Sequence, residues 1–182
     1  MENQGKYSAK KLTNAIYRAY LESLALLVKW LLGHGYDIQL LIGDGYDQYL
    51  TEDFKSLLTT RLEVFDDAHV LHAPATSVEE LLAQLAGTDI VVATRFHNIL
   101  LALLLNKPVI SISFHHKCAS LMEEMGLSAY CHDINHMNAG RLIEQFQELE
   151  RNAEKLKPAI KQRVEQSRRA LEEQYSVIFK SV

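Results

Sequence analysis

Hydrophobic positions along the chain switch repeatedly between helical spacing and short continuous runs. From Ala9 to Leu32 the large apolar residues recur every three or four positions, which predicts one long helix ended by Gly33 and Gly35. Short apolar runs bounded by Gly, Pro, Asp or Asn follow and alternate with further helical patterns. These runs predict strands at 36–42, 70–72, 90–93, 108–114 and 129–131, separated by helices at 47–60, 77–85, 96–105 and 116–125. Ser77-Val78-Glu79-Glu80 predicts a capping box at the start of the helix at 77–85.

This order of elements predicts an α/β fold, a Rossmann-like parallel sheet with helices on both faces. We expect a single domain over residues 1–182, in which residues 138–182 form a helical C-terminal extension that packs on it. Pro158 is expected to start the last of the C-terminal helices. The chain opens on a helix, whereas a doubly wound domain normally opens on a central strand. Without that strand, an edge of the sheet would stay unpaired. A second copy or a complementing N-terminal half would then cover this edge.

Composition narrows the class of protein. Of 182 residues, 48% are hydrophobic and 23% charged, which is typical of a soluble globular protein. A net charge of −4 gives no basic surface for nucleic acid or an anionic membrane. The longest apolar run, 99–105, is too short to span a bilayer, and the polar N-terminus does not indicate a signal peptide. Cys118 and Cys131 read as reduced thiols, so we expect a cytoplasmic protein.

Cationic side chains follow two neighbouring predicted strands. Arg95 and His97 come directly after the strand at 90–93, with Thr94 at the expected N-cap, and His116 and Lys117 come after the strand at 108–114. Because the carboxyl ends of parallel strands meet at one edge of a sheet, these groups should emerge together. Helix N-termini there favour negative charge. The pattern predicts an anion site, although paired surface cations and a histidine bonded to backbone would give the same sequence.

Two further features are less specific. Asp47 follows Gly43-Asp44-Gly45 after another strand, and it fits either a substrate hydroxyl or, slightly better, a cap for the next helix. The histidine pairs 69/72 and 132/136 have spacings that suit metal ions. No Cys or carboxylate stands beside them as in a zinc site, so we expect no metal.

An ordered set of short motifs resembles a known family. These motifs are Thr94-Arg95-Phe96-His97, Asn106-Lys107-Pro108-Val109-Ile110-Ser111-Ile112, Lys117 and Met125-Gly126-Leu127. In this order they resemble the C-terminal half of the polysaccharide pyruvyl transferase family. The helix before Gly35-Tyr36-Asp37-Ile38 fits as well, so the resemblance covers about residues 10–150.

The resemblance implies two Rossmann-like domains facing a cleft, as in GT-B glycosyltransferases, of which this chain would be the C-terminal one. It implies transfer of a pyruvyl group from phosphoenolpyruvate to a sugar hydroxyl in exopolysaccharide or cell-wall glycan biosynthesis, with no further cofactor. The family's Arg-x-His falls on Arg95 and His97, and its Lys on Lys117. His97 would then transfer the proton, while Arg95 and Lys117 hold the anionic donor. His116 and Phe114 depart from the family pattern, so donor contacts there would differ.

Two other functions stay open at this stage. The chain could be the donor-binding half of a GT-B glycosyltransferase, with Arg95 and Lys117 on a diphosphate. It could also be a non-catalytic assembly domain that docks through its C-terminal helices. Because the resemblance reaches only half of the family fold, the chain would be either a truncated or split member or one that a partner or second copy completes. In both cases we expect it to be inactive alone.

Overall fold

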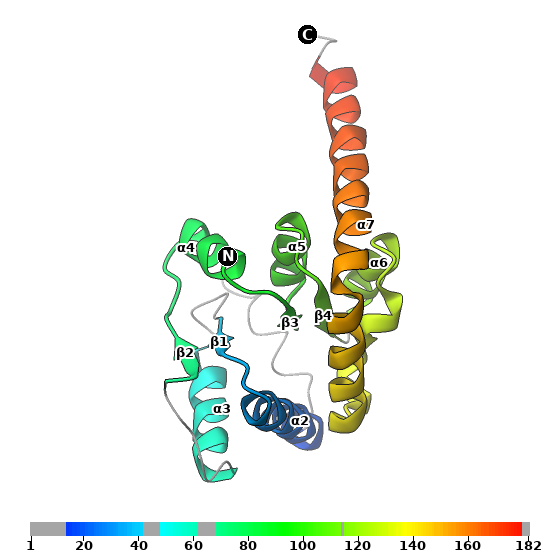
Figure 1. Cartoon of the computed structure of the whole chain (residues 1–182). Helices are drawn as coiled ribbons and strands as arrows, with labels where there is room; N and C mark the ends of the chain where they lie inside the picture. Colours follow the sequence, from blue (N-terminus) through cyan, green and yellow to red (C-terminus); the bar gives the residue numbers. More distant parts are fainter. Residues whose placement is uncertain (1–13, 42–47, 62–67, 114, 180–182) are drawn as a thin grey trace. The chain divides into compact units, whose positions relative to one another are not determined.

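The computed structural model describes residues 14–41, 48–61, 68–113 and 115–179 (Figure 1). The chain divides into two compact units. The first unit comprises Met1–Leu81 and His132–Gln145, and the second comprises Leu82–Cys131 and Phe146–Val182. Each unit is described by itself below.

The first unit packs two helices beside a pair of parallel strands. Its elements are α2 (Asn14–Gly33), β1 (Ile38–Leu40), α3 (Gln48–Arg61), β2 (Val70–His72), the start of α4 (Val78–Ala86) and the 3-10 turn η3 (Ile134–His136). Strands β1 and β2 are parallel, with Ile38 opposite Val70. The core forms where Leu21, Ala25 and Val28 of α2 meet Phe54 and Leu58 of α3.

The second unit carries the strands that precede the candidate site. It contains β3 (Val91–Ala93), α5 (Phe96–Leu104), β4 (Val109–Ile112), α6 (His116–Glu124), the 3-10 turn η2 (Ser128–Tyr130), the start of β5 (Cys131–His132) and most of α7 (Ala139–Phe179). The strand order is β3-β4-β5, and β3 runs parallel to β4 with Val91 opposite Val109. Every residue of β4 is buried. The carboxyl ends of β3 and β4 therefore share one edge, as predicted.

Helices α5 and α6 end in the same backbone geometry. Asn106 follows α5 with φ 57°, and Gly126 follows α6 with φ 70°. The amide of Lys107 donates to the Ala102 oxygen at 2.9 Å, and the amide of Leu127 donates to the Met122 oxygen at 2.7 Å. Both are Schellman caps, which require a left-handed residue just past the helix. The sequence predicts helix α6 over 116–125, and its end just before Gly126 is confirmed.

The start of α4 uses a modified capping box. The Glu80 amide donates to Ser77 Oγ at 3.2 Å, as the sequence predicts. The Glu80 carboxylate accepts from the amide of Thr76 at 2.7 Å and from its hydroxyl at 2.9 Å. The reciprocal bond thus reaches one residue further back than in the standard box.

The C-terminal region is one continuous helix, so the expected helix start at Pro158 is wrong. Helix α7 runs from Ala139 to Phe179 with Pro158 inside it. Proline lacks an amide hydrogen and its ring crowds the preceding turn, at a cost of about 3 kcal/mol. Pro158 is exposed, while Leu149 and Ile160 on either side of it are fully buried. Burial of these neighbours offsets the cost and holds the helix together.

The described elements confirm a mixed α/β fold of short parallel sheets flanked by helices, with a C-terminal helix. No helix among the described ranges is both long enough and apolar enough to cross a membrane. The single domain over 1–182 and the likeness to half of a GT-B fold stay predictions.

Candidate anion site at the helix starts

The start of α5 is set by Arg95. Its backbone is extended, with φ −95° and ψ 135°, and its carbonyl accepts the first helical hydrogen bond from the Ile99 amide at 3.1 Å. Arg95 is therefore the N-cap, and the predicted N-cap at Thr94 is wrong by one residue. No side chain caps this helix start. Strand β3 ends at Ala93, so Thr94 lies between the strand and the N-cap.

The start of α6 is built in a related way. His115 is the N-cap, and its amide donates to Ser113 Oγ at 2.9 Å. His116 and Lys117 are the first two helical residues, and both side chains are exposed. The rings of His115 and His116 lie 5.3 Å apart at a 30° tilt. Two imidazoles and an ammonium thus gather at one helix start.

A shallow hollow joins the two helix starts. Phe96, the first residue of α5, lines it together with residues from one face of α6, and its volume is about 250 Å³. The α6 residues that line it are His116, Lys117, Ser120, Leu121 and Glu124. The structure therefore brings His116 and Lys117 together beside the start of α5. Sequence reasoning missed Phe96, Ser120 and Glu124, although the spacing of Ser120 and Glu124 from Lys117 places them on its helix face.

Arg95 and His97 flank Phe96 in the chain but are not among the described residues that line the hollow. Arg95 is half-buried, and His97 is exposed. The His97 ring meets the Phe96 ring edge-on, with 5.7 Å between the centroids. The candidate residues therefore form two adjoining groups, one around the hollow and one on the first turn of α5. Asp47 and Phe114 lie outside the described residues.

The electrostatics of both helix starts favour an anion. Neither α5 nor α6 has an acidic residue in its first turn; instead, Arg95 is the N-cap of α5 and Lys117 lies in the first turn of α6. A cation at a helix N-terminus faces the positive end of the helix dipole, which is unfavourable unless an anion offsets it. Amide groups of a first helical turn also donate readily to phosphate or carboxylate. The arrangement can bind a small anion and offers an imidazole for proton transfer.

Comparison with known proteins supports the family resemblance found in the sequence. The sequence profile of the polysaccharide pyruvyl transferase family matches residues 3–116, which include Arg95, His97 and His116 and end one residue before Lys117. The match starts earlier and ends earlier than the expected 10–150. The amylovoran biosynthesis protein AmsJ of Erwinia amylovora is 27% identical over 89 residues, 49% of this chain. The aligned stretch spans only 21% of that relative's length.

Proposed function

Because the chain belongs to the polysaccharide pyruvyl transferase family, we propose that it binds phosphoenolpyruvate and takes part in transferring its pyruvyl group to a sugar hydroxyl. The product would be a ketal on a glycan made for an exopolysaccharide or the cell wall. The likeness to an amylovoran biosynthesis protein supports a role in glycan assembly. The observation that carries the proposal is the pairing of His116 and Lys117 with the start of α5 around one hollow.

The donor carries a phosphate and a carboxylate, and the site offers cations for both. Lys117 and His116 stand at the hollow, and Arg95 stands at the N-cap of the neighbouring helix. A guanidinium suits a carboxylate or phosphate because it donates two parallel hydrogen bonds. We assign Arg95, His116 and Lys117 to donor binding. Asp47 stays a candidate for contact with a substrate hydroxyl.

His97 is the proton-transfer residue in this proposal. Ketal formation adds a proton to the methylene carbon of the donor, and an acceptor oxygen bonds to the adjacent carbon. Phosphate leaves when a second hydroxyl of the acceptor takes its place on that carbon. An imidazole is suited to such steps near neutral pH, and His97 is exposed on the first turn of α5.

The acceptor side of the reaction belongs to the proposal too. The aligned stretch covers about a fifth of the relative's length, 21%. We propose that acceptor binding needs protein beyond residues 1–182, either a complementing N-terminal half or a second copy. Half of a cleft can hold a donor but cannot position an acceptor or exclude water. Cytoplasmic action, where phosphoenolpyruvate is made, follows from this donor.

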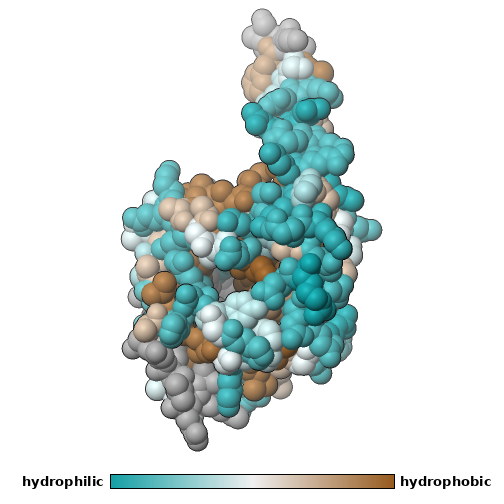
Figure 2. Space-filling view, viewed as in Figure 1, coloured by the Kyte–Doolittle hydropathy of each residue, from teal (hydrophilic) through white to brown (hydrophobic). Residues whose placement is uncertain are grey.

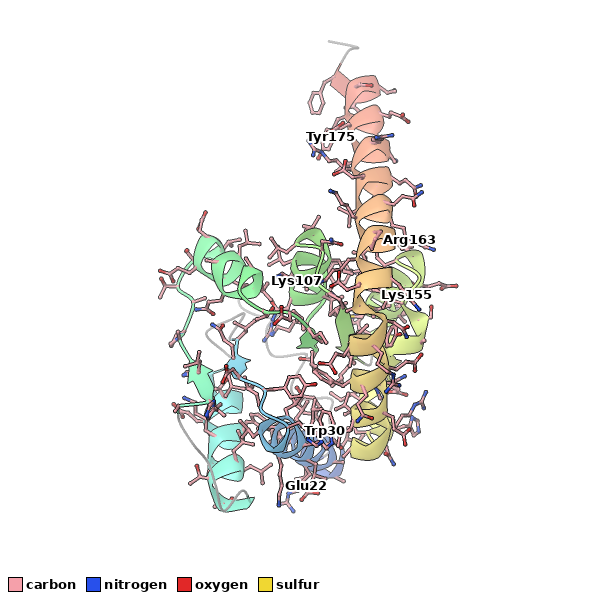
Figure 3. All side chains as sticks on the ribbon, viewed as in Figure 1. Glu22, Trp30, Lys107, Lys155, Arg163 and Tyr175 are labelled. Atoms are coloured by element: carbon pink, nitrogen blue, oxygen red, sulfur yellow. The ribbon has the colours of Figure 1, made fainter. Side chains whose placement is uncertain are left out.

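A binding experiment tests the donor assignment. Thermal unfolding is followed with phosphoenolpyruvate, inorganic phosphate or a nucleotide sugar, using wild type, Lys117→Gln and Lys155→Gln. Lys155 is an exposed lysine on α7 and serves as the matched control (Figure 3). We expect phosphoenolpyruvate to raise the melting temperature of wild type and Lys155→Gln but not of Lys117→Gln. A shift with the nucleotide sugar alone would assign the site to a glycosyltransferase instead.

A second experiment separates binding from chemistry. His97→Gln should keep the thermal shift with phosphoenolpyruvate and lose the release of phosphate in the presence of acceptor and any completing partner. His136→Gln, at an exposed histidine of the first unit, is the control and should release phosphate at the wild-type rate. Transfer at an unchanged rate in His97→Gln would remove His97 from the mechanism.

A further inference from the structure

The apolar face of α7 continues beyond the part of the helix that the protein covers. At 100° per residue, the apolar positions 146, 149, 160, 164, 171, 175 and 178 fall within about 80° of one another around the helix. Phe146, Leu149 and Ile160 on this face are buried. Leu171 and Ile178 lie on the same face and are 52% and 62% exposed. A face that is buried in one half of a helix is therefore bare in the other half.

The bare half ends in large side chains. Tyr175 and Phe179 are 54% and 67% exposed, and their rings stack with centroids 5.8 Å apart. Figure 2 shows apolar surface near this end of α7, and Figure 3 shows Tyr175 standing out from the helix. Contiguous apolar side chains of this kind mark interaction sites when they are bordered by charge.

The bordering charges are arranged in two blocks of opposite sign. Arg168 and Arg169 precede Leu171, and Glu172 and Glu173 follow it. A parallel pair of such helices would set each block beside its own copy. An antiparallel pair would set the basic block of one helix beside the acidic block of the other. Among two-fold symmetric pairs, the charge pattern is therefore complementary to itself only in the antiparallel direction.

We propose that the C-terminal part of α7 pairs antiparallel with the same part of a second copy of this chain, centred on Leu171. In this register Leu171 meets Leu171 of the other copy, and Val164 of each helix meets Ile178 of its partner. Val164 is half-buried beside a hollow of about 250 Å³ that is also lined by Leu104 and Leu105 of the α5 end. The exposed Leu104 side chain makes this hollow a seat for the partner's helix end. The pairing is two-fold symmetric and closes on itself as a dimer.

The oligomeric state of the full chain tests the pairing. Sedimentation equilibrium should give twice the chain mass of 20.7 kDa for wild type. Leu171→Glu and Ile178→Glu should each weaken association by about 100-fold, because each places a charge in an apolar contact. Gln162→Glu and Gln166→Glu add the same charge on the opposite helix face and should leave the dimer intact. Circular dichroism checks that every variant keeps its helix content.

Cysteine cross-linking tests the direction. A chain carrying both Val164→Cys and Ile178→Cys should form a disulfide-linked dimer, whereas Ile178→Cys alone should not. Wild type sets the background from Cys118 and Cys131. Cross-linking of Ile178→Cys alone would mean a parallel pair and would overturn the proposal. A wild-type chain that stays monomeric at micromolar concentrations would overturn the proposal as well. If that monomer bound phosphatidylglycerol vesicles through Leu171, the apolar face would be a membrane-binding surface instead.

Discussion

Arg163 of α7 donates a hydrogen bond from Nη1 to the main-chain oxygen of Glu124, the last residue of α6. The guanidinium thereby places a positive charge at the negative end of the α6 dipole, where it stabilises the helix. The same guanidinium lies over the cap residue Gly126. One side chain thus couples α7 to the C-terminus of the helix whose other end carries His116 and Lys117.

We expect Gly126→Ala to lower the free energy of unfolding by about 1–3 kcal/mol. The backbone at Gly126 has φ 70°, which strains any residue with a Cβ. An added Cβ would also lie 2.9 Å from Arg163 Nη2, so the guanidinium would have to move. Urea denaturation of the purified chain measures the loss.

Two companion variants separate these causes. Gly87→Ala meets nothing closer than a carbonyl oxygen at 3.4 Å and should change stability little. In an Arg163→Ala background, Gly126→Ala should lose only the cost of the left-handed backbone. Equal losses in both backgrounds would show that the close approach of Arg163 contributes nothing.

The second prediction concerns the matching cap at the end of α5. Asn106 adopts φ 57°, and its side-chain oxygen is buried without a hydrogen-bond partner among the described residues. Asn106→Gly removes both penalties, so the free energy of unfolding should rise by about 0.5–1 kcal/mol. Asn106→Ala should lower it, because alanine tolerates this backbone less well than asparagine. If glycine and alanine destabilised equally, the Asn106 side chain itself would be holding the cap.

The third prediction is a pH dependence that arises from buried histidine. His132 is only 5% exposed, and its Nε2 has no partner among the described residues. Burial, and next the charge of Arg141, lower the pKa of His132 below its usual 6.5, while a hydrogen bond with Gln145 opposes the shift. Below about pH 6.5 the unfolded chain takes up a proton that the folded chain refuses. Stability should therefore fall as the pH drops from 6.5 toward the folded-state pKa.

Urea denaturation at a series of pH values from about 7.5 to about 5 measures this slope, which one histidine limits to about 1.4 kcal/mol per pH unit. Burial and the charge of Lys55 also lower the pKa of His72, so it contributes in the same direction. His132→Gln should flatten part of the slope, and the double variant with His72→Gln should flatten more. A slope that His132→Gln leaves unchanged would contradict this assignment.

The sequence predicted the elements well wherever short-range signals agree. The Gly126 stop, the strand at Val70–His72 and the shared edge of β3 and β4 are all present. These features depend on local chemistry or on the direction of parallel strands. The helix start predicted at Pro158 was wrong because the cost of a proline inside a helix is offset by the burial of Leu149 and Ile160. This burial depends on the tertiary fold, which no local sequence pattern reveals. The N-cap predicted at Thr94 was wrong by one residue, because the preference of threonine for capping positions does not fix where the helix begins.

The candidate site was predictable only in part. The positions of Arg95, His97 and Lys117 after the strands follow from the alternation of elements, and His116 with Lys117 does line a hollow. The rotation of α5 about its axis decides which side chain reaches the hollow. It brings Phe96 there rather than Arg95 or His97. This rotation is set by packing of its buried residues Ile99, Ala102 and Leu103, which periodicity alone does not fix.

The last prediction sets stability against binding at Arg95. The residue is the N-cap of α5, yet no side chain caps the helix, and its charge faces the positive end of the helix dipole. Arg95→Ser supplies a capping hydroxyl that Arg95→Ala lacks, so the free energy of unfolding should be about 0.5–1 kcal/mol higher for Arg95→Ser than for Arg95→Ala. Both variants remove the charge and should lose the thermal shift with phosphoenolpyruvate. If the two variants were equally stable and kept the shift, Arg95 would be a structural residue and the donor site would rest on Lys117 and His116.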